Sequence, residues 1–410
     1  MAELEKILEA LGGERRIDYS LNRFQRALAS IGNPEKNVQT LVIAGTNGKG
    51  TVSLLLSSAL REAGFSVGTY LSPHLQAVQE RFLHNLTPIK EAPLDALAVE
   101  LEPVAKSHDL TYFEFLTLIH YVWSSREGFD FNVMECGLGG RLDATNVNDP
   151  IATVITNISY DHQEYLGDTL EKILEEKMGV LRPEALLFTG VREKALLERI
   201  DQRCLELDAI PYFAKEIQTK ITGIFPDRQT VTFNDYPFTL SNPSQTAVEN
   251  ASLAFLLMRI VFPKIPMEIL HQAFAQVKNP GRMETVQENP RVILSGDHNP
   301  AGIASLIETL ERSGIHRPKI ICAFSPDKPH AEMYRSLAEI SGEITLTSVP
   351  RLRDKMPAAY FELGPYVENP VQAVEQVLGR AQPSDTLVIT GSLYLIGEVR
   401  GLWRETAVFR

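Results

Sequence analysis

Short apolar runs recur along this chain, and most are followed by a longer segment that can form a helix. Residues 41–44, 65–71 and 131–135 are such runs, and residues 52–64 form a helical segment that ends at a glycine. Unbroken apolar runs of this length suit parallel strands that are buried on both faces of a sheet. The alternation of strands and helices therefore predicts an α/β fold.

The alternation is interrupted at two places. Residues 221–240 contain strand-forming residues separated by Pro-Asp and Asn-Asp turns, which predict an antiparallel hairpin at the edge of the first domain. Residues 279–284 are rich in residues that break helices and strands, and we expect a domain hinge there. We predict an N-terminal domain with a mostly parallel sheet over residues 1–280 and a C-terminal, Rossmann-like, doubly wound domain over residues 281–410.

Composition narrows the class of protein. A length of 410 residues fits two or three domains, and a net charge of −12 argues against a nucleic-acid-binding protein. The cysteines at 136, 204 and 322 lack the spacing of a metal site and indicate a reduced protein. There is no apolar signal segment at the N-terminus and no run long enough to cross a membrane. We therefore expect a cytoplasmic protein, a monomer, without nucleic-acid or membrane partners.

The strongest chemical signal is the glycine-rich segment between the strand at 41–44 and the following helix. Glycines let backbone N–H groups approach an anion closely, and a helix start adds positive potential. Lys49 can reach the outer phosphates of a nucleotide, and the Thr51 hydroxyl can bind Mg²⁺. The alternative is a glycine-rich turn that binds nothing. The candidate ATP-binding residues are Gly45, Thr46, Asn47, Gly48, Lys49, Gly50 and Thr51.

The sequence GTNGKGT at residues 45–51 resembles the nucleotide loop of the folylpolyglutamate synthase/dihydrofolate synthase family, which belongs to the Mur ligases. A second specific similarity covers residues 135–146. The resemblance implies that the N-terminal domain is a phosphate-loop ATPase domain and that the C-terminal domain binds an amino acid. It also implies an ATP-dependent ligase that adds L-glutamate to a folate-type carboxylate, with ATP and Mg²⁺ as cofactors.

Two residues near strand ends and one lysine of a predicted helix are candidates for metal binding or catalysis. Glu135 ends a predicted strand, and a carboxylate beside a phosphate loop is well placed for Mg²⁺. The resemblance assigns His162 to a second Mg²⁺ and makes Lys177 a carbamylated, metal-binding lysine. Without it, His162 would be a surface residue and Lys177 would belong to a solvated helix face. The candidate metal residues are therefore Thr51, Glu135 and His162.

The loop after the strand at 65–71 is the candidate site for the acceptor substrate. Ligands of open α/β sheets bind at the carboxyl edge of the sheet, where this loop is expected. The alternative is an ordinary solvated loop. The resemblance places the pterin-bearing substrate in this loop. Glu114 lies among aromatic residues at a predicted helix start, and we expect it to serve core packing. The candidate substrate-binding residues are Ser72, Pro73, His74 and Arg81.

Further candidates come from the second half of the chain through the same resemblance. Asn250 and Arg282 are expected to contact ATP. His298 is expected to act on the side of the incoming glutamate, so that the predicted catalytic residues are Lys49, Lys177 and His298. Ser392, at the end of a predicted strand, is a further substrate-binding candidate.

The largest departure from the family lies at residues 295–300. The family has Asp-Gly-Ala-His-Asn-Pro, whereas this chain has Ser-Gly-Asp-His-Asn-Pro, so the carboxylate moves from position 295 to position 297. We expect Asp297 to take over a polar contact to ATP or glutamate and Ser295 to be a passive small residue.

Three other functions are compatible with the sequence. A Mur-type ligase could use another acceptor, a phosphate-loop kinase would act without glutamate, and an inactive relative would only bind ligands. The last of these alternatives rests on the departures at 295–297 and on Ala247, which stands where the family has glutamine. The sequence also leaves open whether dihydropteroate, tetrahydrofolate or both are the acceptor.

Overall fold

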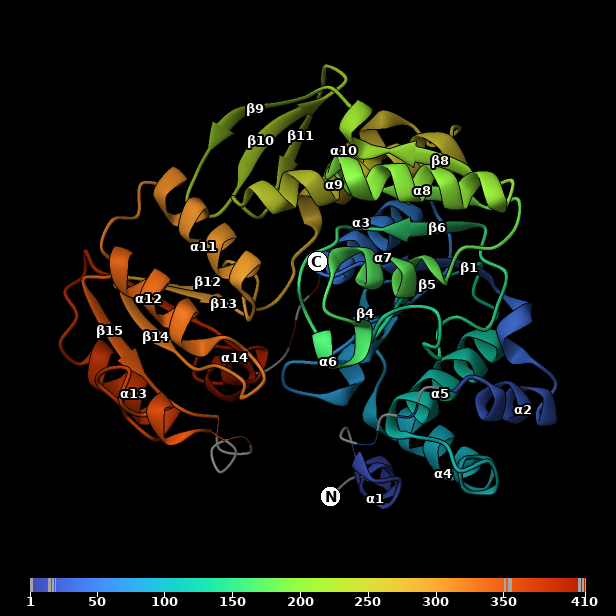
Figure 1. Cartoon of the computed structure of the whole chain (residues 1–410), viewed down its shortest axis with the longest axis horizontal. Coiled ribbons are helices and arrows are strands. Elements are labelled where there is room, and N and C mark those ends of the chain that lie inside the picture. The colour runs from blue at the N-terminus through green and yellow to red at the C-terminus, as the bar shows by residue number, and fades with distance from the viewer. Residues whose placement is uncertain are drawn as a thin grey trace. The chain divides into compact units, whose positions relative to one another are not determined.

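The computed structural model describes residues 3–13, 16, 18, 20–349, 352, 356–404, 407 and 409. The chain divides into two compact units, whose elements are labelled in Figure 1. Unit 1 comprises residues 1–218 and 249–274, and unit 2 comprises residues 219–248 and 275–410. The strands between 219 and 240, expected at the edge of the first domain, are thus grouped with unit 2.

Unit 1 contains an eight-stranded sheet in the order β4-β3-β2-β5-β1-β6-β7-β8. β1 lies between β5 and β6 and is parallel to both, so the loops that follow these three strands meet at one edge. β3 and β4 are short antiparallel additions beyond β2 that the apolar pattern does not predict. The strands are β1 Gln39–Ala44, β2 Val67–Tyr70, β3 Phe82–His84, β4 Thr87–Pro88, β5 Phe131–Glu135, β6 Ala152–Ile155, β7 Leu186–Thr189 and β8 Ile210–Phe213.

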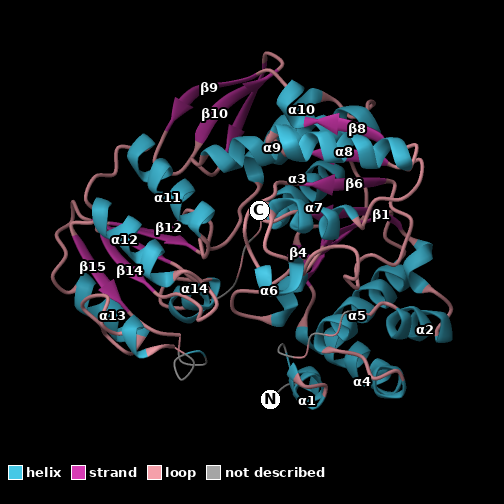
Figure 2. Cartoon of the chain, in the orientation of Figure 1, coloured by secondary structure: helices cyan, strands magenta, loops and turns pink. Residues whose placement is uncertain are grey.

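Helices cover both faces of this sheet. α3 packs against β1, β2 and β5, whereas side chains of α7 and α8 pack with Val42 and Ala44, which project from β1 on the opposite face. α3 begins at Lys49, three residues before the helix expected from the sequence, so Gly50 and Thr51 lie in its first turn. The helices, drawn in cyan in Figure 2, are α1 Glu3–Ala10, α2 Asn22–Ser30, α3 Lys49–Glu62, α4 Glu91–Ser107, α5 Tyr112–Glu127, α6 Gln163–Leu166, α7 Leu170–Met178, α8 Lys194–Glu206, α9 Gln245–Val261 and α10 Met267–Gln276.

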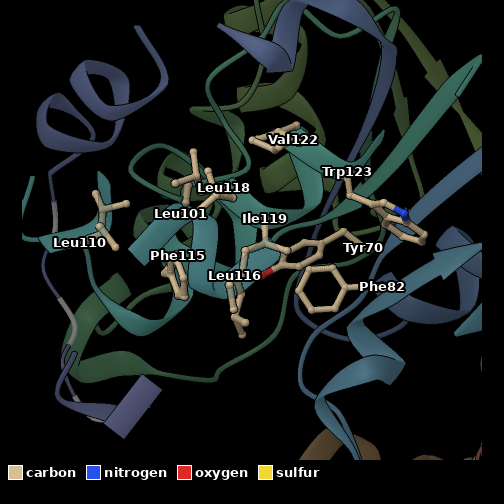
Figure 3. Close-up of a cluster of buried hydrophobic side chains, with 14 of the residues drawn as sticks. Tyr70, Phe82, Leu101, Leu110, Phe115, Leu116, Leu118, Ile119, Val122 and Trp123 are labelled. Atoms are coloured by element: carbon tan, nitrogen blue, oxygen red, sulfur yellow. The ribbon is translucent and has the colours of Figure 1, made fainter. Parts of the chain in front are cut away.

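A large aromatic and aliphatic cluster anchors α5 to the sheet (Figure 3). The rings of Tyr70 and Phe82, from β2 and β3, meet edge to face with centroids 5.7 Å apart. Phe115, Leu116 and further α5 side chains fill the space beside them. Burying such side chains stabilises the fold by about 1.5–3 kcal/mol each, which explains why α5 is apolar over most of its surface.

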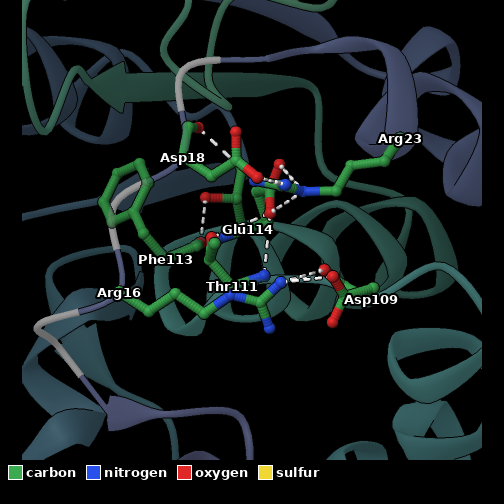
Figure 4. A network of polar contacts seen from close by, with 8 residues as sticks. Arg16, Asp18, Arg23, Asp109, Thr111, Phe113 and Glu114 are labelled. Atoms are coloured by element: carbon green, nitrogen blue, oxygen red, sulfur yellow. Dashed lines mark hydrogen bonds and ion pairs between the residues drawn. The ribbon is translucent and has the colours of Figure 1, made fainter.

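Glu114 forms part of a polar network at the start of α5 (Figure 4). Its carboxylate accepts hydrogen bonds from the backbone N–H and hydroxyl of Thr111, both at 2.8 Å, while the Thr111 hydroxyl caps the helix. Arg23 donates to both carboxylate oxygens at 2.9 and 3.0 Å, and also pairs with Asp18. Glu114 thus caps α5 and, through Arg23, joins it to the first turn of α2, which are structural roles.

Unit 2 contains two sheets. The three-stranded antiparallel sheet consists of β9 Thr219–Ile224, β10 Gln229–Phe233 and β11 Tyr236–Leu240, with a turn at each of the two positions expected from the sequence. The five-stranded sheet has the order β12-β13-β16-β14-β15 and is parallel except for β12. Its strands are β12 Glu284–Glu288, β13 Arg291–Ser295, β14 Lys319–Cys322, β15 Glu343–Leu346 and β16 Thr386–Thr390.

The helices of unit 2 alternate with the parallel strands, and the predicted α/β class is confirmed. The helices are α11 Pro300–Arg312, α12 His330–Ile340, α13 Pro370–Leu378 and α14 Leu393–Arg400. A buried ion pair between Arg400 of α14 and Glu284 of β12, with bonds of 2.8 and 2.9 Å, joins the last helix to the antiparallel edge strand. Within the described residues, the model has no helix that is both long and apolar enough for a membrane span.

Candidate active site

The loop between β1 and α3 has a backbone that only glycine tolerates at two positions. Gly45 and Gly48 have φ angles of +136° and +87°. A Cβ atom at Gly45 would lie 1.9 Å from the hydroxyl of Thr156, and one at Gly48 would lie 2.3 Å from Oδ1 of Asn250. The glycines therefore let this loop fold tightly between two polar side chains, with the first turn of α3 directly behind it.

Lys49 is the first residue of α3, and its ammonium group bends back over the loop. Its Nζ donates to the carbonyl of Thr46 at 3.0 Å. Helix-start N–H groups lack partners within the helix and carry partial positive charge, which the lysine reinforces. Loop, helix start and lysine together form an arrangement suited to phosphate oxygens.

Glu135 links this loop to the predicted acceptor loop. In the sheet it pairs with Ile43 of β1, so its side chain lies next to the loop that follows β1. Its Oε2 accepts a hydrogen bond of 3.0 Å from the backbone N–H of Ser72. A Cβ atom on Gly50 would lie 3.4 Å from the same oxygen. The structure thus brings Glu135, the start of α3 and Ser72 together.

The predicted acceptor loop is held by a residue that sequence reasoning did not single out. The buried carboxylate of Glu80 accepts hydrogen bonds from the backbone N–H groups of residues 75–77, at 2.7 to 3.4 Å. Arg81 donates from Nε to Nδ1 of His74 at 2.9 Å, and its guanidinium lies 5.5 Å from the centroid of the Tyr112 ring. His74 and Arg81 are therefore neighbours, with an aromatic ring beside them.

Lys177 lies in the interior, so the alternative of a solvated helix face is wrong. The residue is only 4% exposed, and its Nζ donates to the carbonyl of Gly45 at 2.8 Å. Burial, together with the positive charge of nearby Lys49, lowers the pKa of Lys177 to about 7. Near neutral pH a substantial fraction of this amine is therefore uncharged and nucleophilic.

Asp143 organises the glycine-rich segment after Glu135 and was not among the candidates. It accepts hydrogen bonds of 2.9 Å from the N–H groups of Gly137, Leu138 and Thr145, and one of 2.7 Å from the Thr145 hydroxyl. Burial raises the pKa of its carboxyl group, against the opposing effect of these bonds. A short polar side chain two residues before a threonine is a recognisable turn signal.

The predicted metal residue His162 lies in the segment that follows β6. It precedes α6 in the left-handed conformation, with φ of +50°, and its side chain is 44% exposed. Ser159, three residues earlier, is hydrogen-bonded through its backbone to the Thr46 hydroxyl at 3.1 Å. The segment is thus tied to the phosphate loop, whereas the side chain of His162 remains accessible.

The candidates in unit 2 gather at the carboxyl edge of its five-stranded sheet. Ser295 and Thr390 are register partners at the ends of β13 and β16, and Asp297, His298 and Ser392 follow these strands. Arg282 donates to the carbonyl of Gly296 at 2.9 Å, and His298 Nδ1 lies 3.0 Å from the same oxygen. The Ser392 hydroxyl accepts from the backbone N–H of Tyr394 at 3.2 Å and so caps α14.

Ser295 is not the passive residue that the sequence suggested. Its hydroxyl donates to Oδ2 of Asp297 at 2.6 Å and accepts from the backbone N–H of Met283 at 3.2 Å. The side chain of Asp297 is therefore held in one orientation by the residue that replaces the family's aspartate. The two changes at 295 and 297 form one hydrogen-bonded pair.

Comparisons with known proteins agree with this arrangement. Residues 43–257 match the Mur ligase middle domain, and residues 281–393 match the domain described as "Mur ligase, glutamate ligase domain". Dihydrofolate synthase/folylpolyglutamate synthase of Bacillus subtilis is 31% identical over 93% of this chain and 94% of its own length. The chain belongs to the folylpolyglutamate synthase/dihydrofolate synthase family of Mur ligases.

Two further relatives place the chain within that family. A probable bifunctional folylpolyglutamate synthase/dihydropteroate synthase of Haloferax volcanii is 31% identical over 95% of this chain, which spans 50% of that longer protein. A crystal structure of the bifunctional folylpolyglutamate synthase/dihydrofolate synthase of Yersinia pestis, complexed with AMPPNP and a Mn ion, has a TM-score of 0.84 at 27% identity and covers 97% of both chains.

The few possible metal ligands in this chain fit a metal ion that is bound partly by the phosphates of a nucleotide. Among the described residues, no group of three or more His, Cys, Asp or Glu side chains could hold a metal ion by itself. Mg²⁺ is usually held by one or two carboxylates together with substrate phosphates rather than by a complete protein cage. Glu135 beside the first turn of α3, which carries Thr51, matches that sparse arrangement.

Proposed function

We propose that this chain is an ATP-dependent ligase that joins the α-amine of L-glutamate to a carboxylate of a folate-type substrate. The observation that carries this proposal is the position of Glu135, whose carboxylate lies beside Gly50 at the start of α3 and is hydrogen-bonded to Ser72 of the acceptor loop. One carboxylate thereby links a phosphate-binding loop to a second ligand loop. Such a link is needed where a phosphoryl group moves from ATP to an acceptor.

The reaction proceeds in two steps. An oxygen of the acceptor carboxylate attacks the γ-phosphorus of ATP, and ADP leaves as the P–O bond to the γ-phosphorus breaks. The amine nitrogen of glutamate then attacks the acyl carbon and loses a proton to solvent, and phosphate leaves with the oxygen that had attacked. Lys49 and the helix-start N–H groups stabilise the negative charge on the transferred phosphoryl group.

Thr51, Glu135 and His162 are the residues that would hold Mg²⁺. When bound, Mg²⁺ offsets the like charges of phosphate and acceptor carboxylate. Glu135 also holds Ser72 through its hydrogen bond, and His74 and Arg81, which are hydrogen-bonded to each other, are proposed contacts of the acceptor. Arg282 and Asn250 are proposed contacts of ATP, and His298 and Ser392 are proposed contacts on the glutamate side.

The function is tested by measuring phosphate release with ATP. We expect release that requires both glutamate and either dihydropteroate or tetrahydrofolate. A panel of other carboxylate acceptors distinguishes a different Mur-type ligase. ADP formation that is unaffected by glutamate would instead identify a kinase. We propose a monomer in the cytoplasm, and the choice between the two folate acceptors follows from the same panel.

Lys177 is predicted to react with CO₂. Its uncharged amine forms an N–C bond and loses a proton, which gives a carbamate anion beside the loop. Because only the uncharged amine reacts, the modified fraction and the activity are expected to fall as the pH is lowered below about 7 in bicarbonate-depleted buffer. Added bicarbonate should restore both, with the carbamate followed by carbon-13 NMR.

The variant Lys177→Ala separates this role from a purely structural one. It should be nearly inactive and should recover part of its activity with short carboxylates, which replace the carbamate oxygens. Full activity of this variant, or a carbamate signal that persists in it, would contradict the assignment to Lys177.

Asp297 is predicted to contribute a polar contact to ATP or glutamate. Asp297→Ala should raise the KM for one of these substrates by about tenfold, the loss expected for one charge-assisted hydrogen bond. Ser295→Ala should give a smaller increase in the same KM, because it keeps the carboxylate and removes the bond that orients it, together with the bond from the Met283 N–H. Unchanged or improved kinetics of Asp297→Ala would show that the carboxylate is neutral or harmful at this position.

A further inference from the structure

The segment after β6 continues alongside the phosphate loop beyond the end of the sheet. β1 and β6 pair as parallel strands as far as Ala44 and Ile155. Further along, the N–H of Thr156 donates to the carbonyl of Ala44, and the N–H of Thr46 donates to the carbonyl of Asn157, both at 2.9 Å. The loop therefore packs against residues 156–159.

Residues 156 and 157, together with Lys49, bind every backbone N–H and C=O group of the two central loop residues, Thr46 and Asn47. At Thr46, the N–H is bound to the carbonyl of Asn157, and the carbonyl accepts from Lys49. At Asn47, the N–H donates to Oδ1 of Asn157 at 2.9 Å, and the carbonyl accepts from the Thr156 hydroxyl at 2.7 Å. Both carbonyl oxygens, which would repel phosphate, are thus bound to donors of the protein.

Asn157 contacts both of these loop residues, because its carbonyl accepts from the Thr46 N–H and its side-chain oxygen accepts from the Asn47 N–H. Because an N–H group can only donate, the atom facing Asn47 must be the oxygen of the amide, which fixes the orientation of the side chain. The flanking residues, Gly45 and Gly48, are both at positive φ, which glycine adopts without steric cost. Because glycine has more conformational freedom in the unfolded chain than other residues, ordering this segment costs more entropy, and the bonds to residues 156 and 157 offset that cost.

We propose that Asn157 is a positioning residue for nucleotide binding. Its carbonyl and side-chain oxygen hold residues 46 and 47, so that the N–H groups at the start of α3 are the ones presented to the phosphates. This inference rests on the nucleotide site proposed above. A general stabilising role for Asn157 would make a different prediction, because it would affect thermal stability without acting on the loop in particular.

The test compares Asn157→Ala with a matched control, Asn369→Ala. Asn369 also accepts a backbone N–H through Oδ1, from Gln372 at 3.1 Å, but it caps α13 in unit 2. ADP affinity is measured by calorimetry, and hydrogen exchange is followed in a peptide that covers residues 44–50. We expect Asn157→Ala to weaken ADP binding by about tenfold and to speed loop exchange, and the control to change neither.

Asn157→Asp gives a second readout that does not depend on nucleotide. Aspartate keeps an oxygen in place for the Asn47 N–H, so the exchange protection of the loop should be retained. Wild-type protein that does not bind ADP would refute the proposed nucleotide site itself. Wild-type binding together with unchanged affinity and loop exchange in Asn157→Ala would overturn the role of Asn157. Equal losses in the Asn369→Ala control would do the same.

Discussion

Replacing Lys49 with alanine is expected to lower the rate of ligation by about three orders of magnitude, which is the scale of losing one preorganised group that stabilises developing charge. The ammonium group lies over the loop and donates to the carbonyl of Thr46. Its loss therefore removes charge from the phosphate site while leaving the apolar contacts of α3 intact.

The control for this variant is Lys172→Ala. Lys172 is an exposed lysine of α7 whose partner is Asp168, at 2.8 Å. This change should leave the rate unaltered, and circular dichroism should show that both variants retain the fold. Ligase activity near the wild-type rate in a folded Lys49→Ala protein would refute the assignment of the nucleotide loop.

Glu135→Gln is the second change with a large expected effect. Glutamine is nearly isosteric and keeps an oxygen that can accept from the Ser72 N–H, so the acceptor loop should hold its position. It removes the negative charge beside the start of α3 and with it the strongest oxygen donor for Mg²⁺. We expect the rate to fall by about two to three orders of magnitude.

A titration with Mg²⁺ distinguishes a metal ligand from a structural residue. If Glu135 binds the metal, high Mg²⁺ should restore part of the lost activity, because the remaining donors bind the ion more weakly. Wild-type activity of Glu135→Gln at ordinary Mg²⁺ would mean that the carboxylate serves only to hold Ser72.

Much of the fold is predictable from the apolar pattern. The strand at Phe131–Glu135 has the bounds expected from the sequence, because a strongly apolar segment is bounded by clear breaks. β3 and β4 are too short to give a periodic signal, and β12 is a polar edge strand. The early start of α3 depends on a helix turn that includes Gly50, which disfavours helix in isolation.

The candidate site shows where sequence reasoning ends. The pattern identifies Lys49 and Glu135, because a glycine-rich loop and a strand-end carboxylate carry local signals. It does not reveal that Lys177 is buried, because its neighbours at 175 and 176 are acidic and its burial depends on the packing of Gly139 and Gly140 on α7. The bond between Ser295 and Asp297 likewise depends on the geometry of the turn after β13.

The most direct test of the account is an oxygen-18 transfer experiment. Tetrahydrofolate or dihydropteroate labelled in its reactive carboxylate is incubated with ATP, Mg²⁺ and glutamate, and both products are analysed by mass spectrometry. The account predicts a folate product extended by one glutamyl unit and inorganic phosphate that carries one labelled oxygen from the carboxylate. Phosphate without the label, or hydrolysis of ATP with no glutamylated product from either acceptor, would contradict ligation through an acyl phosphate.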